Sequence, residues 1–121
     1  MDTLSCFSLL HGYFFVIVDQ PKITVQPQGK TKTEGDNLTL SCNTTGNPVA
    51  KISWTRNGTA VNSSGRISFS ADNKQLTITN VSRTDNGEYR CVARNSLGND
   101  TSNTAKVDVQ CNFFYDHFLG I

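Results

Sequence analysis

Two cysteines, one tryptophan and one tyrosine place the strongest constraint on how this 121-residue chain can fold. Cys42 and Cys91 are 49 positions apart, Trp54 follows the first by twelve positions, and Tyr89 precedes the second by two. Cysteines at this separation can join two β-sheets face to face, a tryptophan can pack on their sulfurs, and a tyrosine hydroxyl can hold a loop corner. The four residues describe a scaffold and carry no reaction chemistry.

Apolar and polar residues alternate with the period of two that is typical of half-buried β-strands. Leu38 and Leu40 fall on one face of such a strand, and Leu76 and Ile78 fall on one face of another. Turn residues separate the runs, and Asn57-Gly58 suits a two-residue hairpin because both residues tolerate positive φ. No stretch has a helical period. The pattern predicts seven or eight short strands in a two-sheet antiparallel sandwich.

A series of motifs stands in register between about Pro21 and Gln110. They are Gly35-Asp36-Asn37-Leu38-Thr39-Leu40-Ser41-Cys42, Ile52-Ser53-Trp54, Arg66-Ile67, Leu76-Thr77-Ile78, Asp85-x-Gly87-x-Tyr89-x-Cys91 and Ala93-Arg94-Asn95-Ser96-Leu97-Gly98. Together they resemble the immunoglobulin superfamily, in particular its short intermediate (I-set) domains. The cysteine spacing is similar to that of the short sets, because variable-type domains insert two extra strands and have a longer gap.

The resemblance implies an all-β, two-sheet antiparallel Greek-key sandwich with one disulfide between the sheets, from Cys42 to Cys91. Metal ligation by these two cysteines is the alternative, but no cysteine or histidine stands near them at a zinc spacing. A partly buried ion pair between Arg66 and Asp85 is also implied. The expected structural residues are Trp54, Tyr89, Leu40, Leu76, Ile78, Asp85, Arg66 and Gly87. The strand that begins near Ile23 is expected at a sheet edge, where Pro27 limits unwanted pairing.

The two ends depart from this pattern, so we expect the domain to cover residues 19–110. Residues 1–18 form an apolar leader that resembles a signal peptide, although Asp2 stands where basic residues are usual and no small-residue cleavage site follows. Residues 111–121 form an aromatic tail, expected to be unstructured. For both ends the alternative is translated non-coding sequence that flanks one exon. Cys6 and Cys111 lie in these segments, and pairing with each other and an intermolecular link through Cys111 both stay open.

Six Asn-x-Ser/Thr sequons fall within 65 residues, and none has proline in the middle position. The potential N-glycosylation sites are Asn37, Asn43, Asn57, Asn62, Asn80 and Asn99. Together with the disulfide pattern they predict an oxidising, secretory environment, and hence a secreted protein or a cell-surface ectodomain.

Other kinds of chemistry find no support in the sequence. His11 and His117 lie outside the expected sandwich, so no Ser-His-Asp or Cys-His set can form within it. Acidic residues are too scattered for a calcium site, and basic residues do not alternate with surface aromatics as nucleic-acid binding would require. The leader is short for a membrane span. We therefore expect no enzyme activity, cofactor, metal, nucleic-acid partner or membrane span.

A binding surface remains, and the outward positions of two adjacent strands are the candidate. They form a flat, basic patch; ordinary exposed strand surface is the alternative. The candidate residues are Lys51, Ser53, Thr55, Arg90 and Arg94, with Val92 between the arginines and the expected loop Asn95–Asn99 beside them.

The resemblance implies an extracellular recognition or adhesion module within a longer multi-domain protein, similar to neural cell adhesion molecules or hemicentin-like proteins. It would bind a protein partner, homophilically or heterophilically. One alternative is an intracellular filament module of the titin type, in which the cysteines would stay reduced and the sequons unused. Another is a small secreted single-domain immune ligand.

Overall fold

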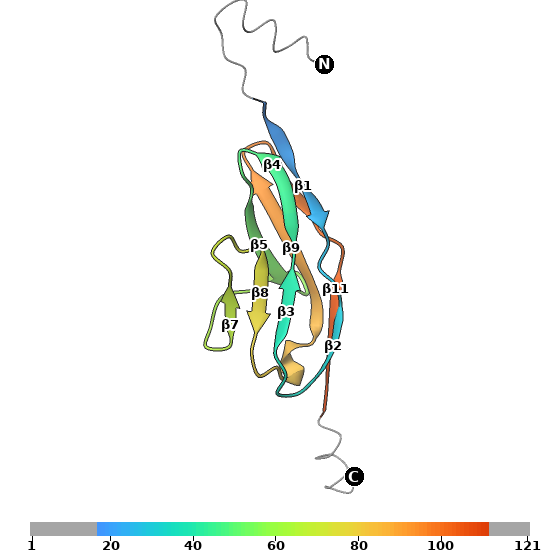
Figure 1. Cartoon of the computed structure of the whole chain (residues 1–121). Coiled ribbons are helices and arrows are strands. Elements are labelled where there is room, and N and C mark those ends of the chain that lie inside the picture. The colour runs from blue at the N-terminus through green and yellow to red at the C-terminus, as the bar shows by residue number, and fades with distance from the viewer. Residues whose placement is uncertain (1–16, 112–121) are drawn as a thin grey trace, which may run out of the picture.

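Residues 17–111 are described in the computed structural model of this chain, and they form β-sheets packed face to face (Figure 1). The strands are β1 (Asp19–Val25), β2 (Lys30–Thr33), β3 (Leu38–Ser41), β4 (Asn43–Asn47), β5 (Lys51–Arg56), β6 (Thr59–Ala60), β7 (Ile67–Phe69), β8 (Gln75–Ile78), β9 (Gly87–Asn95), β10 (Gly98–Thr101) and β11 (Ala105–Gln110). A 3-10 turn, η1 (Arg83–Asp85), precedes β9. The predicted all-β sandwich is confirmed.

One layer of the sandwich contains β3, β8 and β7 in antiparallel pairing, with β1 paired to β4 above them. The other layer has the order β2-β11-β9-β5-β6, and β10 also pairs with β9. β2 runs parallel to β11, while the other paired strands of the described chain are antiparallel. The described chain enters at one end of the long axis and leaves at the other (Figure 1). Within residues 17–111, no helix has the length and apolar character needed to cross a membrane.

The core lies between the two layers, where the inward residues of the strands meet. Burial follows the alternation seen in the sequence: in β11, Ala105, Val107 and Val109 are buried while the residues between them are exposed. Cys42 and Cys91 form the expected disulfide, with their Cα atoms 6.6 Å apart. The buried hydrophobic residues are Ile23, Leu38, Leu40, Cys42, Ile52, Trp54, Leu76, Ile78, Val81, Tyr89, Cys91, Ala93, Ala105, Val107 and Val109.

Residues 17–111 contain eleven strands, more than the seven or eight expected, because local irregularities divide segments that the alternation treats as continuous. Ser102 causes one such break, between β10 and β11. This residue is buried, its hydroxyl accepts the Cys91 N–H at 2.9 Å, and the same hydroxyl donates to the Asn103 carbonyl at 2.8 Å.

The loop expected at Asn95–Asn99 is instead a tight hairpin, which corrects the sequence-based boundary. β9 continues to Asn95, β10 begins at Gly98, and these two residues are partners in the ladder. Only Ser96-Leu97 remains as the turn, and the Leu97 N–H donates to the Asn95 side-chain oxygen at 2.9 Å. The hairpin brings β10 beside β9 and so widens the sheet.

Candidate recognition face

β5 and β9 are neighbours along six residue pairs, and their outward side chains form the candidate recognition surface. Lys51 lies opposite Arg94, Ser53 opposite Val92, and Thr55 opposite Arg90. Residues opposite each other in an antiparallel ladder point to the same side of the sheet. The structure therefore brings together all of the residues predicted for this surface, which we call the β5–β9 face: Lys51, Ser53, Thr55, Arg90, Val92 and Arg94.

The intervening residues of the same strands hold this face in place from beneath. Ile52 and Trp54 of β5 are buried, as are Tyr89, Cys91 and Ala93 of β9. A slip of one residue in either strand would put charged side chains into the core, so burial dictates which residues face solvent. Above them, Lys51, Ser53, Arg90 and Arg94 are exposed, while Thr55 and Val92 are half-buried.

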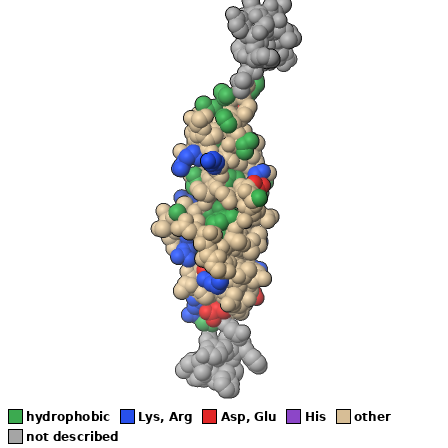
Figure 2. All heavy atoms as spheres, turned by 90° about the vertical axis from the view of Figure 1, so that its left-hand side faces the viewer, with side chains coloured by type: hydrophobic (Ala, Val, Ile, Leu, Met, Phe, Trp, Pro, Cys, Tyr) green, Lys and Arg blue, Asp and Glu red, His purple; other side chains and the backbone are tan. Residues whose placement is uncertain are grey.

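The cations of the β5–β9 face have no ion-pair partner in the described chain, although Asp72 lines the groove beside Lys51 and Arg94. In the described part of the chain, Lys51, Arg90 and Arg94 form no ion pair, and Arg90 donates only to the Thr104 hydroxyl, at 2.9 Å. Figure 2 shows Lys and Arg side chains along the left-hand edge of the molecule, with acidic side chains mainly at its lower end and opposite edge. The face is thus available to a partner that presents negative charge.

The upper part of the face continues into an open groove of about 930 Å³. Lys51, Ser53 and Arg94 line one side of it, and the turn at Ala71–Asn73 lines another. Val49 lies in the same groove with 87% of its surface exposed. The groove therefore combines exposed apolar surface with two cations and one carboxylate, that of Asp72, a composition common in protein-binding sites.

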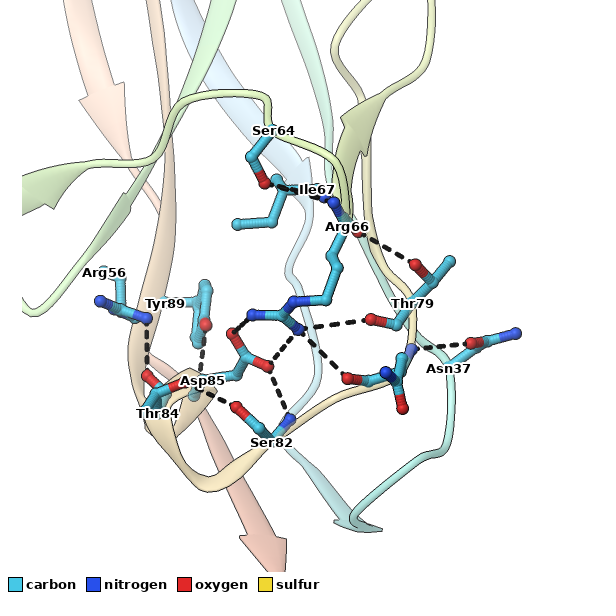
Figure 3. Close-up of polar contacts among 11 residues, drawn as sticks. Asn37, Arg56, Ser64, Arg66, Ile67, Thr79, Ser82, Thr84, Asp85 and Tyr89 are labelled. Atoms are coloured by element: carbon cyan, nitrogen blue, oxygen red, sulfur yellow. Dashed lines mark hydrogen bonds and ion pairs between the residues drawn. The ribbon is translucent and has the colours of Figure 1, made fainter.

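A polar network below the face anchors the start of β9 (Figure 3). Asp85 is buried, and its carboxylate accepts from the Arg66 guanidinium at 2.9 and 3.2 Å and from the Ser82 N–H at 2.8 Å. Burial alone would raise the pKa of Asp85, but the Arg66 guanidinium and the Ser82 N–H together lower that pKa below its usual value. The hydrogen bond and charge of Asp85 in turn raise the pKa of Arg66. The carboxylate is therefore held ionised inside the fold.

Tyr89 connects this network to the candidate face. Its hydroxyl donates to the Asp85 carbonyl at 2.6 Å, across the corner between η1 and β9 (Figure 3). Burial raises the pKa of Tyr89, so the phenol stays protonated and keeps donating. Arg56, from the end of β5, donates to the Thr84 carbonyl at 2.8 Å (Figure 3). These contacts place Tyr89 inward, and Arg90 must then point outward.

Glycine is required at position 87, where β9 begins. Its φ is +156°, and a Cβ there would lie 2.8 Å from the Arg56 side chain and 3.1 Å from the Asn57 amide. Three further structural positions predicted from the sequence are buried as well: Leu76 and Ile78 in β8, and Leu40 in β3 opposite Leu76.

Asn73 is a structural residue that sequence reasoning missed. It lies in the β7–β8 turn with φ of +62°, and its carbonyl accepts from the Trp54 indole N–H at 2.8 Å. Its side-chain amide donates to the Ile52 carbonyl at 3.1 Å. Asn73 thereby joins the two sheets at the open edge of β5. The turn signal Asp72-Asn73 was visible in the sequence, but nothing there pointed to β5.

The six sequon asparagines are all exposed, and they lie in different parts of the molecule. Asn99 is on β10 beside Arg94, and Asn43 is on β4 in the other layer. Asn37 and Asn80 meet, since the Asn80 N–H donates to the Asn37 side-chain oxygen at 3.2 Å. Asn57 occupies the β5–β6 turn. Asn62 follows β6, in the loop before β7.

Several residues considered in the sequence lie outside the described chain. Cys6, His11 and His117 belong to this group, as does most of the leader and the tail. Within residues 17–111, no three His, Cys, Asp or Glu side chains gather in a way that could hold a metal ion.

Comparison with known proteins shows which family the sequence of this chain matches. A family model described as immunoglobulin domain matches residues 20–95. Hemicentin-1 of Homo sapiens is 36% identical over 91 residues, which cover 75% of this chain and 2% of hemicentin-1. MAM domain-containing glycosylphosphatidylinositol anchor protein 2 of Homo sapiens is 41% identical over 80 residues, 65% of this chain and 8% of that protein.

The solved structures include similar domains from other proteins. A crystal structure of a complex of titin M10 and obscurin like 1 Ig matches with a TM-score of 0.71 and 30% identity, over 77% of this chain and 96% of that chain. By contrast, the chain spans only 2% to 8% of the length of the two curated relatives.

Proposed function

This chain belongs to the immunoglobulin domain family, and we propose that it acts as an extracellular recognition and adhesion module that binds a protein partner through the β5–β9 face. The observation that carries the proposal is a set of three cations on one sheet surface, none of which forms an ion pair within residues 17–111: Lys51, Arg90 and Arg94. A partner with acidic side chains would complement this surface and be steered toward it.

The extracellular part of the proposal is supported by the Cys42–Cys91 disulfide and by the exposure of all six sequon asparagines. Disulfides persist in oxidising compartments and are rare in the cytosol. The name of one relative, the glycosylphosphatidylinositol anchor protein, refers to a membrane anchor. Adhesion is supported by the likeness to hemicentin-1.

The size of the face fits a weak contact that is repeated along a longer protein. A standard interface takes about 800 Å² from each partner, and one sheet face of a small domain supplies no more than about that. Several such domains in series raise the overall affinity through effective concentration, without any new contact. We therefore place the chain within a multi-domain protein.

Site-directed photocrosslinking tests the recognition face. A photoreactive amino acid at Ser53 on β5 is compared with one at Ser68 on β7, an exposed serine of the other layer. The purified chain itself is the probe for homophilic binding, and washed cells that display surface proteins are the probe for heterophilic binding. We expect defined crosslinks from Ser53, lost on Arg94→Glu. Crosslinks from Ser68 alone, or from both positions equally, would contradict the proposal.

A titin-type intracellular filament module is the second candidate, favoured by the likeness to the titin M10 and obscurin like 1 complex. The two candidates predict different covalent states for the cysteines and for the sequon asparagines. Protein isolated from its natural source should gain about 2 Da per disulfide on reduction and lose mass on glycosidase treatment if it is extracellular. Reduced cysteines and unmodified asparagines would exclude the extracellular candidate and favour the filament one.

A further inference from the structure

We propose that Asn99 carries an N-linked glycan that covers the Lys51–Arg94 end of the β5–β9 face, so that modification of one asparagine regulates what the face can bind. The proposal rests on the extracellular function proposed above, because the glycan is added in the secretory pathway. Among the six sequon asparagines, Asn99 is the one whose ladder partner belongs to the β5–β9 face.

The register of three strands places Asn99 in a row with two cations. Asn99 of β10 lies opposite Arg94 of β9, and Arg94 lies opposite Lys51 of β5. Neighbouring strands are about 4.8 Å apart, so the backbone of Asn99 is about 5 Å from that of Arg94 and about 10 Å from that of Lys51. Side chains in one row point to the same side of the sheet, and a glycan on Asn99 therefore projects over both cations.

The local structure leaves the Asn99 side chain free for modification. Asn99 and Thr101, the first and third residues of the sequon, are exposed, while the half-buried Asp100 between them turns inward and accepts the Ile23 N–H at 2.8 Å. Within the described chain the Asn99 amide makes no hydrogen bond. By contrast, the Asn57 side chain accepts the Glu88 N–H at 2.9 Å and lies against Gly87.

The modification is a substitution at the side-chain nitrogen of Asn99. A lipid-pyrophosphate-linked oligosaccharide is the donor, and the Asn99 Nδ2 attacks the anomeric carbon of its first sugar. The bond from nitrogen to that carbon forms, the bond from the carbon to the pyrophosphate oxygen breaks, and lipid pyrophosphate leaves. One proton of Nδ2 passes to a base of the transferase, and no electron is gained or lost.

A glycan at this place changes the chemistry of the face. Two of its three cations, Lys51 and Arg94, come to lie under a bulky, hydrated oligosaccharide, while Arg90 lies four residues along β9, about 13 Å away. The unmodified face exposes all three cations, whereas the modified face exposes mainly Arg90. The same chain can thus exist in a form that binds acidic surfaces more strongly and a form that binds them less strongly.

The test uses the full chain secreted from mammalian cells and compares wild type with Asn99→Gln and with Asn43→Gln, a matched removal of a sequon on the other layer. Occupancy of Asn99 is read by glycosidase release in ¹⁸O water followed by peptide mass spectrometry. Exposure of the cations is read by the salt concentration that elutes the protein from immobilised heparin, used here as a sulfated polyanion probe. Electrostatic retention of this kind falls with ionic strength.

We expect Asn99 to be occupied and Asn99→Gln to elute at higher salt than wild type, with Asn43→Gln unchanged. Adding Lys51→Glu and Arg94→Glu to Asn99→Gln should abolish the shift. Because Asn99 is exposed, Asn99→Gln should fold. Trimming the wild-type glycans with an endoglycosidase that leaves one sugar on each asparagine creates no new carboxylate, and it should shift elution in the same direction without any substitution. An unmodified Asn99 in the secreted chain, or equal elution of wild type and Asn99→Gln, would overturn the proposal.

Neither readout requires a protein partner. A negative result in these two measurements would overturn the glycan proposal but would not test the recognition function, which the Ser53 crosslinking experiment tests. Conversely, absence of the Ser53 crosslinks would not contradict a glycan on Asn99 that covers Lys51 and Arg94.

Discussion

At the scale of single residues, Asp85 shows how the fold keeps a charge in its interior. Its side chain is only 3% exposed, whereas that of its ion-pair partner Arg66 is 38% exposed. Burial opposes ionisation, but a bidentate guanidinium and a backbone N–H stabilise the carboxylate enough to lower its pKa. The pair ties the segment before β7 to η1 and holds the corner from which β9 starts.

The lowered pKa of Asp85 predicts a loss of stability in acid. Its contribution is fully present above the pKa of an unfolded aspartate, about 3.9, and is lost as the pH falls through the lower folded-state pKa. We expect Asp85→Asn to lower the free energy of unfolding by about 1–3 kcal/mol at pH 7, because hydrogen bonds to a charged group are lost. Below about pH 3.9 the difference from wild type should shrink.

Urea denaturation between pH 7 and pH 2 measures this difference. Asp108→Asn, at an exposed position of β11 without an ion pair in the described chain, is the control and should follow wild type more closely. A constant difference between Asp85→Asn and wild type across the whole range would contradict the linkage.

Individual residues were predictable to different degrees. Arg66, Asp85, Tyr89 and Trp54 stand in sequence motifs with a family counterpart, and the structure places each of them in the expected contacts or core. Asn73 had no such motif. It joins a turn to a distant strand, and a contact of that kind depends on how two sheets stack.

At the scale of elements, the segment from β1 to β2 crosses from one layer of the sandwich to the other. β1 pairs with β4, while β2 pairs in parallel with β11. Pro27 and Gly29 lie between these strands, and Pro27 is buried. At Gly29 the two backbones approach so closely that a Cβ would lie 2.7 Å from the Lys106 carbonyl oxygen. The expected edge strand near Ile23 is thus the first half of a crossover.

This close approach predicts that Gly29→Ala destabilises the fold. Its Cβ would meet backbone atoms of β11, which cannot rotate away as a side chain can, so β2 must shift. We expect a loss of about 1–3 kcal/mol in the free energy of unfolding, as for other overpacked sites. Gly65→Ala is the matched control, because nothing lies within 4 Å of its Cβ.

Thermal and urea denaturation of the two variants measure the effect. Gly65→Ala should stay within about 0.5 kcal/mol of wild type, as for other surface substitutions. Equal stability of Gly29→Ala and Gly65→Ala would mean that β2 can move away from β11 at no cost.

At the scale of the whole molecule, one covalent bond joins the two layers at the centre of the core. The disulfide between Cys42 and Cys91 closes a loop of 49 residues, and both cysteines are buried. Closing a loop of that length removes unfolded-chain entropy worth about 4 kcal/mol on the chain-entropy model. Domains of this size are stable by about 5–15 kcal/mol in total, so the bond is a large part of that stability.

The double substitution Cys42→Ala and Cys91→Ala should therefore lower the free energy of unfolding by about 4 kcal/mol, with some further loss from the unfilled core volume. Urea denaturation without reductant, compared with wild type, measures the change. The control is the same pair of proteins in reductant, where wild type should lose most of its advantage. A wild type that is equally stable with and without reductant would show that the loop closure contributes little.

The sequence by itself determined the alternation in β5 and β9 and the all-β character of the fold, because local periodicity is displayed directly by a single chain. Its motifs also carried the resemblance to the immunoglobulin superfamily, and that resemblance implied the disulfide partners and the corner built on Tyr89 and Asp85. The tertiary structure alone decided that β1 and β2 join different layers, that Asn73 reaches β5, and that Asn99 stands in one row with Arg94 and Lys51. Strand register and sheet stacking arise from contacts between residues far apart in the chain, and no local pattern encodes them.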